Sequence, residues 1–326
     1  MCYLRNVVPY YICKKMDVVR YNEGFRGEWD AFVSSAKNST FLFLRDYMDY
    51  HADRFTDASL MFYEGGSLRA LLPANICEGV VASHGGLTYG GFILSDDVRG
   101  AEVLELFEVA MLWMKSELSA VRWLYKPVPQ IYSRVPSQED LYALFRVGAQ
   151  LSARSLSSAV NNDARVAFTQ LRRRKIAKAA KMDLTYSLCD DYSSYWTILS
   201  GVLASAHGCR PVHSLDEMQL LASRFPDNIK LYGAFAGGRM VAGCIVYETR
   251  YVAHIQYIAA SDEGKAAGAL DGLFDYLFRE VYYKVDYVDF GISTEDGGRL
   301  LNEGLLFQKE GFGARGVVYD MYEIVL

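Results

Sequence analysis

The sequence has little of what would place a protein outside the cell or inside a membrane. Its 326 residues include only seven prolines and six cysteines, and no two cysteines form a C-x-x-C pair. A chain of this length needs no disulfide framework, so reduced thiols are expected. Met1–Asn6 lacks a basic-then-apolar signal pattern, and no uncharged apolar run approaches the roughly 20 residues that cross a bilayer. We therefore expect a cytoplasmic protein without a membrane span.

Strong catalytic and metal-binding motifs are absent as well. The sequence contains no G-x-x-x-x-G-K-[ST], H-E-x-x-H or G-x-S-x-G segment. His207, Cys209 and His213 fit no standard zinc spacing, and no fourth ligand accompanies them. A metal cofactor is therefore not expected, and function has to be inferred from weaker patterns.

Aromatic residues, in contrast, are abundant. The chain has 24 tyrosines and 17 phenylalanines within a composition that is 51% hydrophobic and 22% charged, which is typical of a folded, soluble protein with an aromatic interior. At roughly 100 to 200 residues per domain, the length predicts two domains. The net charge of −5 argues against a general nucleic-acid binder, so any polyanion contact would need a local basic patch.

Hydrophobic periodicity repeats once along the chain. In the second half it predicts a hairpin, a third strand, a loop, a helix and a closing strand at residues 230–247, 251–260, 261–265, 270–281 and 285–292. The first half shows the same order at residues 60–76, 95–97, 104–118 and 121–125. We interpret this as a duplicated module. The serine-rich segment Ser152–Ser158 is the most linker-like, which predicts modules at 1–155 and 156–326, the second with a basic helical entry segment.

Four helices are predicted between the repeated units, at residues 137–148, 164–182, 193–207 and 214–224; the last begins with the capping box Ser214-x-x-Glu217. The helix at 164–182 carries seven Lys and Arg residues, with no acid between Asp163 and Asp183. Such a run is either a solvated face or a phosphate-binding surface. Arg174, Lys178 and Lys181 share one helical face and could contact a phosphate group.

Two further segments are candidate binding sites. Ser261–Gly268 enters a helix directly from a strand, so its backbone N–H groups, with Gly264, Lys265 and Gly268, could bind a pyrophosphate. The alternative is an ordinary capped turn, which the acids Asp262 and Glu263 favour. In the predicted helix 300–309, Lys309 shares a face with Asn302, Leu305 and Leu306 and has no acid three or four residues away. Its ammonium group either extends along the surface to water or points at a ligand.

These segments resemble the motifs of a known family. Gly304-Leu305 followed by Lys309-x-Gly311-Phe312-Gly313, after the strand Asp289-Phe290-Gly291, resembles the C-terminal motif of Fem-type peptidoglycan aminoacyltransferases. Arg173-x-x-Ile176-x-Lys178-Ala179-x-Lys181 resembles their central segment, and Phe290–Ser293 with His207–His213 is similar to a bacterial branch described as GNAT-like acyltransferases. The resemblance implies an α+β fold of two tandem GNAT-like modules, each a mixed sheet flanked by helices. It also implies a phosphate contact at Arg173 and an active-site role for Lys309.

The donor implied by the resemblance is acyl-CoA, with acetyl as the expected group, and aminoacyl-tRNA is the alternative. The sequence matches the usual binding features for neither donor in full. The long helical arm that Fem-type enzymes often use for tRNA is not evident, and the usual coenzyme A loop, Q/R-x-x-G-x-G/A, is represented only by Gly264 and Gly268.

Amide formation by acyl transfer passes through a tetrahedral oxyanion and requires removal of a proton from the amine. On a GNAT-like module, the strand at Gln256, Tyr257 and Ile258 would offer a backbone N–H to the carbonyl, and Lys309 would supply positive charge near the oxyanion or the substrate phosphate. The base is His207, His213, Glu303 or a water chain, which the sequence does not rank. The expected acceptor is an amine on a small phosphate-bearing sugar or cell-envelope precursor, contacted by Arg173, Arg174, Lys178 and Asn302. The rival interpretation is a non-catalytic binding protein on the same scaffold.

Overall fold

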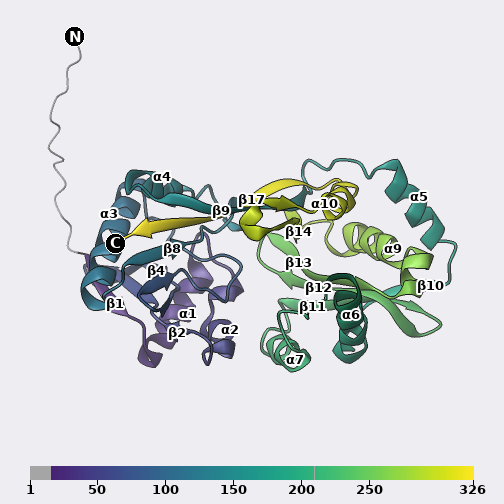
Figure 1. The fold of residues 1–326 in the computed structure, drawn as a ribbon, viewed down its shortest axis with the longest axis horizontal. Helices are drawn as coiled ribbons and strands as arrows, with labels where there is room; N and C mark the ends of the chain where they lie inside the picture. The colour runs from purple at the N-terminus through teal and green to yellow at the C-terminus, as the bar shows by residue number, and fades with distance from the viewer. Residues whose placement is uncertain (1–15, 209) are drawn as a thin grey trace, which may run out of the picture.

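The chain folds into two lobes that are joined by long strands. The computed structural model describes residues 16–208 and 210–326, without the side chains of Ala206 and His207. Figure 1 shows the first lobe in purple and blue and the second mainly in green. The yellow C-terminal strand crosses from the second lobe into the first, so the chain ends beside the elements with which it began.

The first lobe is a mixed α+β unit in which the predicted order of elements is confirmed. The predicted hairpin, long helix and closing strand are β3–β4, α3 and β8, and α3 buries Val103, Phe107 and Met114 at helical spacing. The helices are α1 (Arg26–Ser35), α2 (Arg45–Met48), α3 (Gly100–Glu117) and α4 (Glu139–Arg146). The strands are β1 (Met16–Arg20), β2 (Thr56–Asp57), β3 (Leu60–Glu64), β4 (Ser67–Leu72), β5 (Asn75–Cys77), β6 (Val80–Ala82), β7 (Ile93–Leu94) and β8 (Arg122–Tyr125).

The second lobe also follows the predicted order from its hairpin onward. The hairpin is β11–β12, followed by β13, the helices α8 and α9, and β14. The strands are β9 (Gln150–Asn161), β10 (Leu184–Cys189), β11 (Ile229–Ala236), β12 (Arg239–Glu248), β13 (Val252–Ala260), β14 (Tyr287–Ile292), β15 (Thr294–Glu295), β16 (Leu300–Leu301) and β17 (Arg315–Val325). The helices are α5 (Gln170–Ala179), α6 (Tyr192–His207), α7 (Leu215–Arg224), α8 (Asp262–Ala267), α9 (Ala269–Tyr276) and α10 (Glu303–Glu310).

One sheet runs through both lobes. Its strand order is β10-β11-β12-β13-β14-β9-β17-β8-β6-β5-β2, and a separate sheet of the first lobe has the order β1-β3-β4-β7. Strand β17 makes the connection, because it pairs with β9 over Arg315–Glu323 and with β8 over Tyr322–Val325. The two lobes therefore share backbone hydrogen bonds as well as side-chain contacts.

The segment Ser152–Ser158 is a strand and not the predicted linker. It belongs to β9, which pairs with β14 on one side and with β17 on the other. Two of its serines have side-chain partners: Ser152 Oγ donates to the Met321 carbonyl, and Ser157 Oγ donates to the Asp289 carboxylate. Serine-rich composition suggested flexibility, but long-range pairing satisfies the backbone and fixes the strand.

Two predicted helices are shorter than expected. The basic helix, predicted at 164–182, is α5 over Gln170–Ala179 and begins at Thr169, whose side chain caps the Arg172 N–H. The helix predicted at 300–309 begins after Asn302, because Leu300 and Leu301 pair with Glu295 and Thr294 in a small hairpin. The capping box at Ser214 and Glu217 is confirmed.

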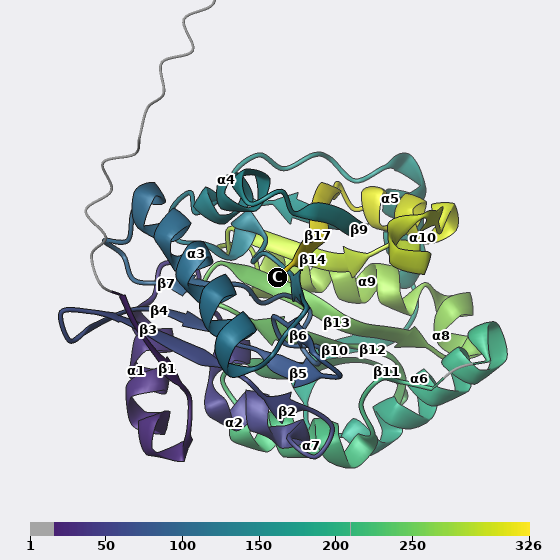
Figure 2. The same cartoon turned by 60° about the vertical axis from the view of Figure 1, so that its left-hand side comes forward.

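The largest hydrophobic core lies between the lobes and is strongly aromatic, as the composition predicts. It contains Trp29, Tyr89 and Tyr132 from the first lobe with Tyr195 and Tyr247 from the second. Helix α7 lies against α2 across this boundary (Figure 2), where Arg54 pairs with Glu217 at 2.7 Å. Among the described residues no helix is long and apolar enough to cross a membrane.

Candidate functional site

Strands β13 and β14 diverge in the middle of the second lobe. They pair in parallel only from Val252–His254 against Tyr287–Asp289, although both continue beyond this point. Opposite the divergence, the pairing of β12 with β13 shifts between Ile245 and Val246, which leaves Gln256 without a partner position on β12. Strand β13 is therefore unpaired with β14 at Gln256–Ile258, and His254 and Asp289 form the last pair before the two strands separate.

Asp289 is a fully buried carboxylate that accepts hydrogen bonds on both oxygens. Oδ1 accepts from Ser157 Oγ at 2.5 Å and from the Gly291 N–H at 3.1 Å. Oδ2 lies 2.8 Å from His254 Nδ1, 2.7 Å from the Tyr319 hydroxyl and 3.2 Å from the Tyr132 hydroxyl. Burial alone raises the pKa of Asp289, but the hydrogen bond and charge of His254, with Ser157 and Tyr319, lower that pKa to about 2.

The ionised Asp289 fixes the tautomer of His254. A carboxylate can only accept, so His254 Nδ1 carries a proton and donates it to Asp289. In the neutral imidazole, Nε2 is then an acceptor, and the side chain is 13% exposed. This is the arrangement in which an oriented histidine takes a proton from a nucleophile.

Lys309 reaches the same place from α10. Its side chain is 3% exposed, and Nζ donates to the carbonyls of Gly291 and Ile292, both at 2.7 Å. Burial lowers the pKa of Lys309 from 10.5 to about 8, although the nearby Asp289 charge raises it. Lys309 therefore does not extend along the surface to water; its ammonium group points inward and is bound by two backbone carbonyls.

Gly291 joins these three side chains. Its N–H donates to Asp289, its carbonyl accepts from Lys309, and a β-carbon at this position would lie 3.4 Å from His254 Cε1. The backbone is left-handed here, with a φ of +74°, which only glycine adopts without strain. The chain thus turns sharply at the end of β14 and presents its carbonyl groups to Lys309.

A cavity of about 400 Å³ lies beside the divergence. It is lined from β13 by Ile258, from α8 and its end by Gly264, Lys265 and Gly268, and from α5 by Lys175. The structure thus brings together four of the residues predicted to bind a cofactor.

The Ser261 turn itself is an ordinary helix start. Ser261 Oγ accepts the Gly264 N–H at 3.1 Å, and Asp262 and Glu263 occupy the first turn of α8. Gly264 is required because a β-carbon would lie 2.2 Å from the Val241 carbonyl oxygen, and Gly268 adopts a left-handed φ of +74°. Both glycines therefore have structural reasons, and Lys265 pairs with Asp262 at 3.1 Å.

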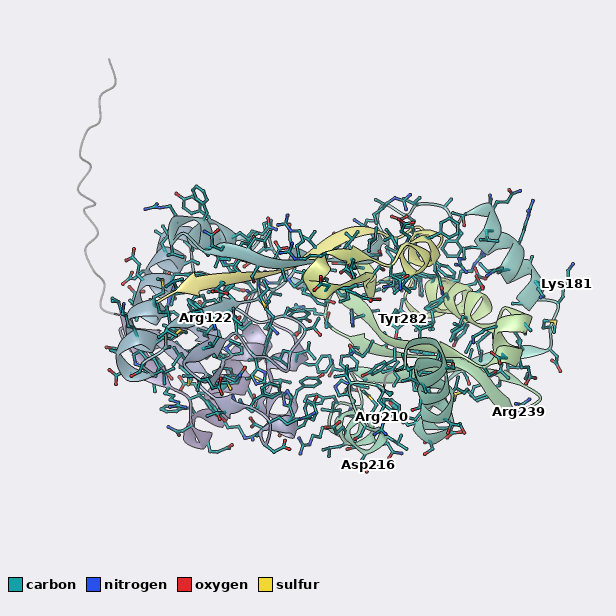
Figure 3. All side chains as sticks on the ribbon, in the orientation of Figure 1. Arg122, Lys181, Arg210, Asp216, Arg239 and Tyr282 are labelled. Carbon is teal, nitrogen blue, oxygen red and sulfur yellow. The ribbon has the colours of Figure 1, made fainter. Side chains whose placement is uncertain are left out.

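The basic helix α5 divides its charges between the interior and the solvent. Arg172 is buried, pairs with Asp271 at 2.7 Å and lies over the Phe312 ring. Arg173, Arg174 and Lys178 are exposed, and in the part of the chain described here they form no ion pair. Lys181 projects outward past the end of this helix (Figure 3). The inward arginine is thus Arg172, where the resemblance had pointed to Arg173.

The other predicted residues lie apart from Asp289. His213 Nδ1 is 2.7 Å from the Tyr257 hydroxyl, and burial lowers the pKa of His213 to about 4. Asn302 caps α10 by accepting the Leu305 N–H, and Glu303 is exposed in the first turn of that helix. His207 ends α6, but its side chain is outside the described set. No group of metal-binding side chains occurs among the residues that the structure describes.

The sequence interpretation missed the pair His254 and Asp289 as functional residues. A signal was present, because each is an ionisable residue inside an apolar strand, in Ala253-His254-Ile255 and Val288-Asp289-Phe290. Buried ionisable groups are rare and are commonly functional. Nothing in the sequence, however, indicates that the two strands lie next to each other at these two residues.

No protein-family model and no curated protein matches the sequence. Solved structures do match. FemX superposes with a TM-score of 0.67 at 11% identity, covering 95% of this chain and 97% of that chain. The C-terminal domain of a putative lysylphosphatidylglycerol synthetase from Agrobacterium fabrum gives 0.58 at 13% identity, covering 91% and 92%. L-PGS from Bacillus licheniformis gives 0.57 at 13% identity, covering 91% and 90%. The chain therefore has the Fem-type fold, a mixed α+β fold of two tandem GNAT-like modules.

Proposed function

We propose that this protein is an acyltransferase that forms an amide. The observation that carries the proposal is the convergence of His254, Asp289 and Lys309 where β13 and β14 diverge. It supplies a base with a free acceptor nitrogen and a positive charge beside an open strand edge. The shared fold with FemX raises the expectation of acyl transfer but does not by itself assign it.

The proposed reaction starts with an amine near His254 Nε2. The amine nitrogen attacks the carbonyl carbon of the donor, and its proton passes to Nε2 while Asp289 stabilises the resulting imidazolium. The carbonyl oxygen becomes an oxyanion, which backbone N–H groups of β13 beyond His254 and the Lys309 ammonium would stabilise. The bond to the carrier then breaks, and the leaving group takes the proton from His254. His254 thus replaces His207, His213 and Glu303 as our proposed base.

The donor would enter through the cavity beside Ile258. An acyl-CoA fits the proposal because a slender thioester arm can lie along the open edge of β13, while Lys175 lines the cavity wall. The carboxylates of Asp262 and Glu263 in the first turn of α8 would repel a pyrophosphate there. The phosphates of the acyl-CoA would therefore lie toward α5 instead. Residues Ile258, Gly264, Lys265 and Gly268 would then form walls and would not cradle the phosphates.

A second donor, aminoacyl-tRNA, is favoured by α5. Its exposed cations, Arg173, Arg174 and Lys178, extend from the cavity wall along one helix and suit several phosphates in a row. Two of the matching folds are those of a putative lysylphosphatidylglycerol synthetase and of L-PGS. With acyl-CoA as the donor, we propose a small amine acceptor that carries a phosphate, because Arg173, Arg174 and Lys178 can hold it while Lys175 at the cavity wall meets the phosphates of the donor.

Direct transfer assays distinguish these proposals. Purified protein is incubated with acetyl-CoA or with a charged tRNA pool and a mixture of phosphate-bearing amines, and products are identified by mass spectrometry. A new amide that disappears in His254→Gln supports the proposal, and ribonuclease treatment tells the tRNA donor from the CoA donor. His84→Asn is the matched control, since it removes a buried histidine and asparagine tolerates the left-handed φ of +54° there.

Absence of calorimetric binding to acetyl-CoA, CoA and a charged-tRNA mimic would overturn the acyltransferase proposal. It would leave the rival, a binding protein on the same scaffold. An amide product that forms equally well with His254→Gln would keep the activity but remove His254 from the mechanism.

A further inference from the structure

Tyr132 connects the first lobe to the proposed catalytic pair. It ends a short 3-10 turn, Gln130–Tyr132, after Pro129, and is 122 and 157 positions from His254 and Asp289 in sequence. Its hydroxyl lies 3.2 Å from Asp289 Oδ2, 3.3 Å from His254 Nδ1 and 3.0 Å from the Tyr319 hydroxyl. A single side chain of the first lobe therefore touches every polar group on this side of Asp289.

The hydrogen positions around Oδ2 follow from the charge on Asp289. Because the carboxylate only accepts, His254 Nδ1–H and the Tyr319 hydroxyl both donate to it. The Tyr132 hydroxyl is then a third donor, and burial raises its pKa well above 10, so it keeps its proton. Tyr132 thus disperses the negative charge of Asp289 and contacts the same nitrogen of His254 that donates to Asp289.

The first lobe holds Tyr132 rigidly in this place. The ring is 2% exposed and packs on Tyr89 with ring centroids 4.6 Å apart. The Tyr89 hydroxyl in turn donates to Thr40 Oγ1 at 3.2 Å. A chain of contacts therefore runs from Thr40 through Tyr89 and Tyr132 to the proposed catalytic pair.

We infer that the first lobe is a working part of the catalytic centre, because it supplies Tyr132 as a positioning residue for the His254–Asp289 pair. This inference rests on the proposed function. Tyr132 touches no reacting atom and acts through Asp289 and His254. The second lobe alone would contain both members of the pair, with Ser157, Gly291 and Tyr319 as donors to Asp289. It would lack Tyr132, the hydroxyl group that lies within 3.3 Å of both His254 and Asp289.

Tyr132→Phe tests the inference, since it removes one hydroxyl and keeps the packed ring. We expect kcat to fall by about 10- to 100-fold with KM within twofold, as for a misplaced catalytic group. The acid limb of the kcat profile should also move to higher pH, because Asp289 with one donor fewer stabilises the imidazolium of His254 more strongly. Tyr47→Phe is the matched control: its hydroxyl, in the same aromatic core, contacts only Tyr247, at 3.5 Å, among the described residues.

A second measurement does not depend on activity. The proton on His254 Nδ1 should give a far-downfield NMR signal that shifts in Tyr132→Phe and stays in place in Tyr47→Phe. If Tyr132→Phe does not fold, 3-fluorotyrosine at position 132 keeps the structure, donates more strongly and should shift that signal in the opposite direction. A signal and a kcat profile unchanged by both replacements would overturn the inference. A shifted signal without any transfer activity would instead show that the proposed function alone is wrong.

Discussion

Replacement of Asp289 by asparagine separates the charge of this side chain from its shape. Asparagine has one acceptor oxygen and one NH₂ group, whereas Asp289 accepts from five donors over two oxygens. Oδ1 accepts from two of these donors and Oδ2 from three, so at least two donors face the NH₂ group of asparagine. Each buried hydrogen bond broken in this way costs about 1 to 3 kcal/mol, so we expect Asp289→Asn to lower the free energy of unfolding by about 2 to 4 kcal/mol.

The pH dependence of this loss follows from the pKa of Asp289. Its lowering from 3.8 to about 2 in the folded state corresponds to about 2 kcal/mol at neutral pH. Because the folded pKa is depressed, this stabilisation is complete above pH 4 and is lost as the pH falls toward 2. The stability gap between wild type and Asp289→Asn should therefore narrow over that range.

Urea unfolding followed by circular dichroism at pH 7, 4 and 3 measures the gap, and the exposed Asp227→Asn is the control. In the transfer assay, loss of the oriented tautomer should reduce kcat by roughly 10³- to 10⁴-fold. An Asp289→Asn protein as stable and as active as Asp227→Asn would refute both the hydrogen-bond analysis and the proposed mechanism.

Three further substitutions test other parts of the structure. Lys309→Met should reduce transfer by about 10²- to 10³-fold without lowering the melting temperature, because burial of the ammonium is itself unfavourable. The transfer rate of the wild-type protein should also fall as the pH rises through about 8, because the pKa of Lys309 is about 8 and the side chain loses its charge there. A Lys309→Met protein that transfers normally would remove this lysine from the mechanism. In urea unfolding, Arg172→Met should lower the free energy of unfolding by about 3 to 5 kcal/mol, because it leaves Asp271 buried and unpaired. Replacement of the exposed Arg173 by methionine should change the free energy of unfolding by no more than about 0.5 kcal/mol. Equal losses in the two variants would contradict the division of charges on α5. Gly264→Ala should lower the melting temperature, because its β-carbon would lie 2.2 Å from the Val241 carbonyl oxygen. Gly201→Ala, where the β-carbon meets open space within a helix, should raise the melting temperature slightly. An unchanged melting temperature of Gly264→Ala would mean that the turn can move.

The sequence by itself determined the local structure and part of the site. Alternating and helical patterns are local properties of the chain, so the second-half hairpin, helix and closing strand are found where they are predicted. The capping box at Ser214 is equally local. Lys309 was singled out because it has no acid three or four residues away, and in the structure its ammonium group donates to the Gly291 and Ile292 carbonyls instead.

Only the tertiary structure decided which residues meet. Ser152–Ser158 has the composition of a linker, yet β14 and β17 make it a central strand. Tyr132 and Tyr319 are 187 positions apart but both reach Asp289. Such contacts depend on strand order and on where β13 and β14 separate, and no periodicity records either. Four of the five donors around Asp289 come from distant segments, so the chemistry of this carboxylate exists only in the folded chain.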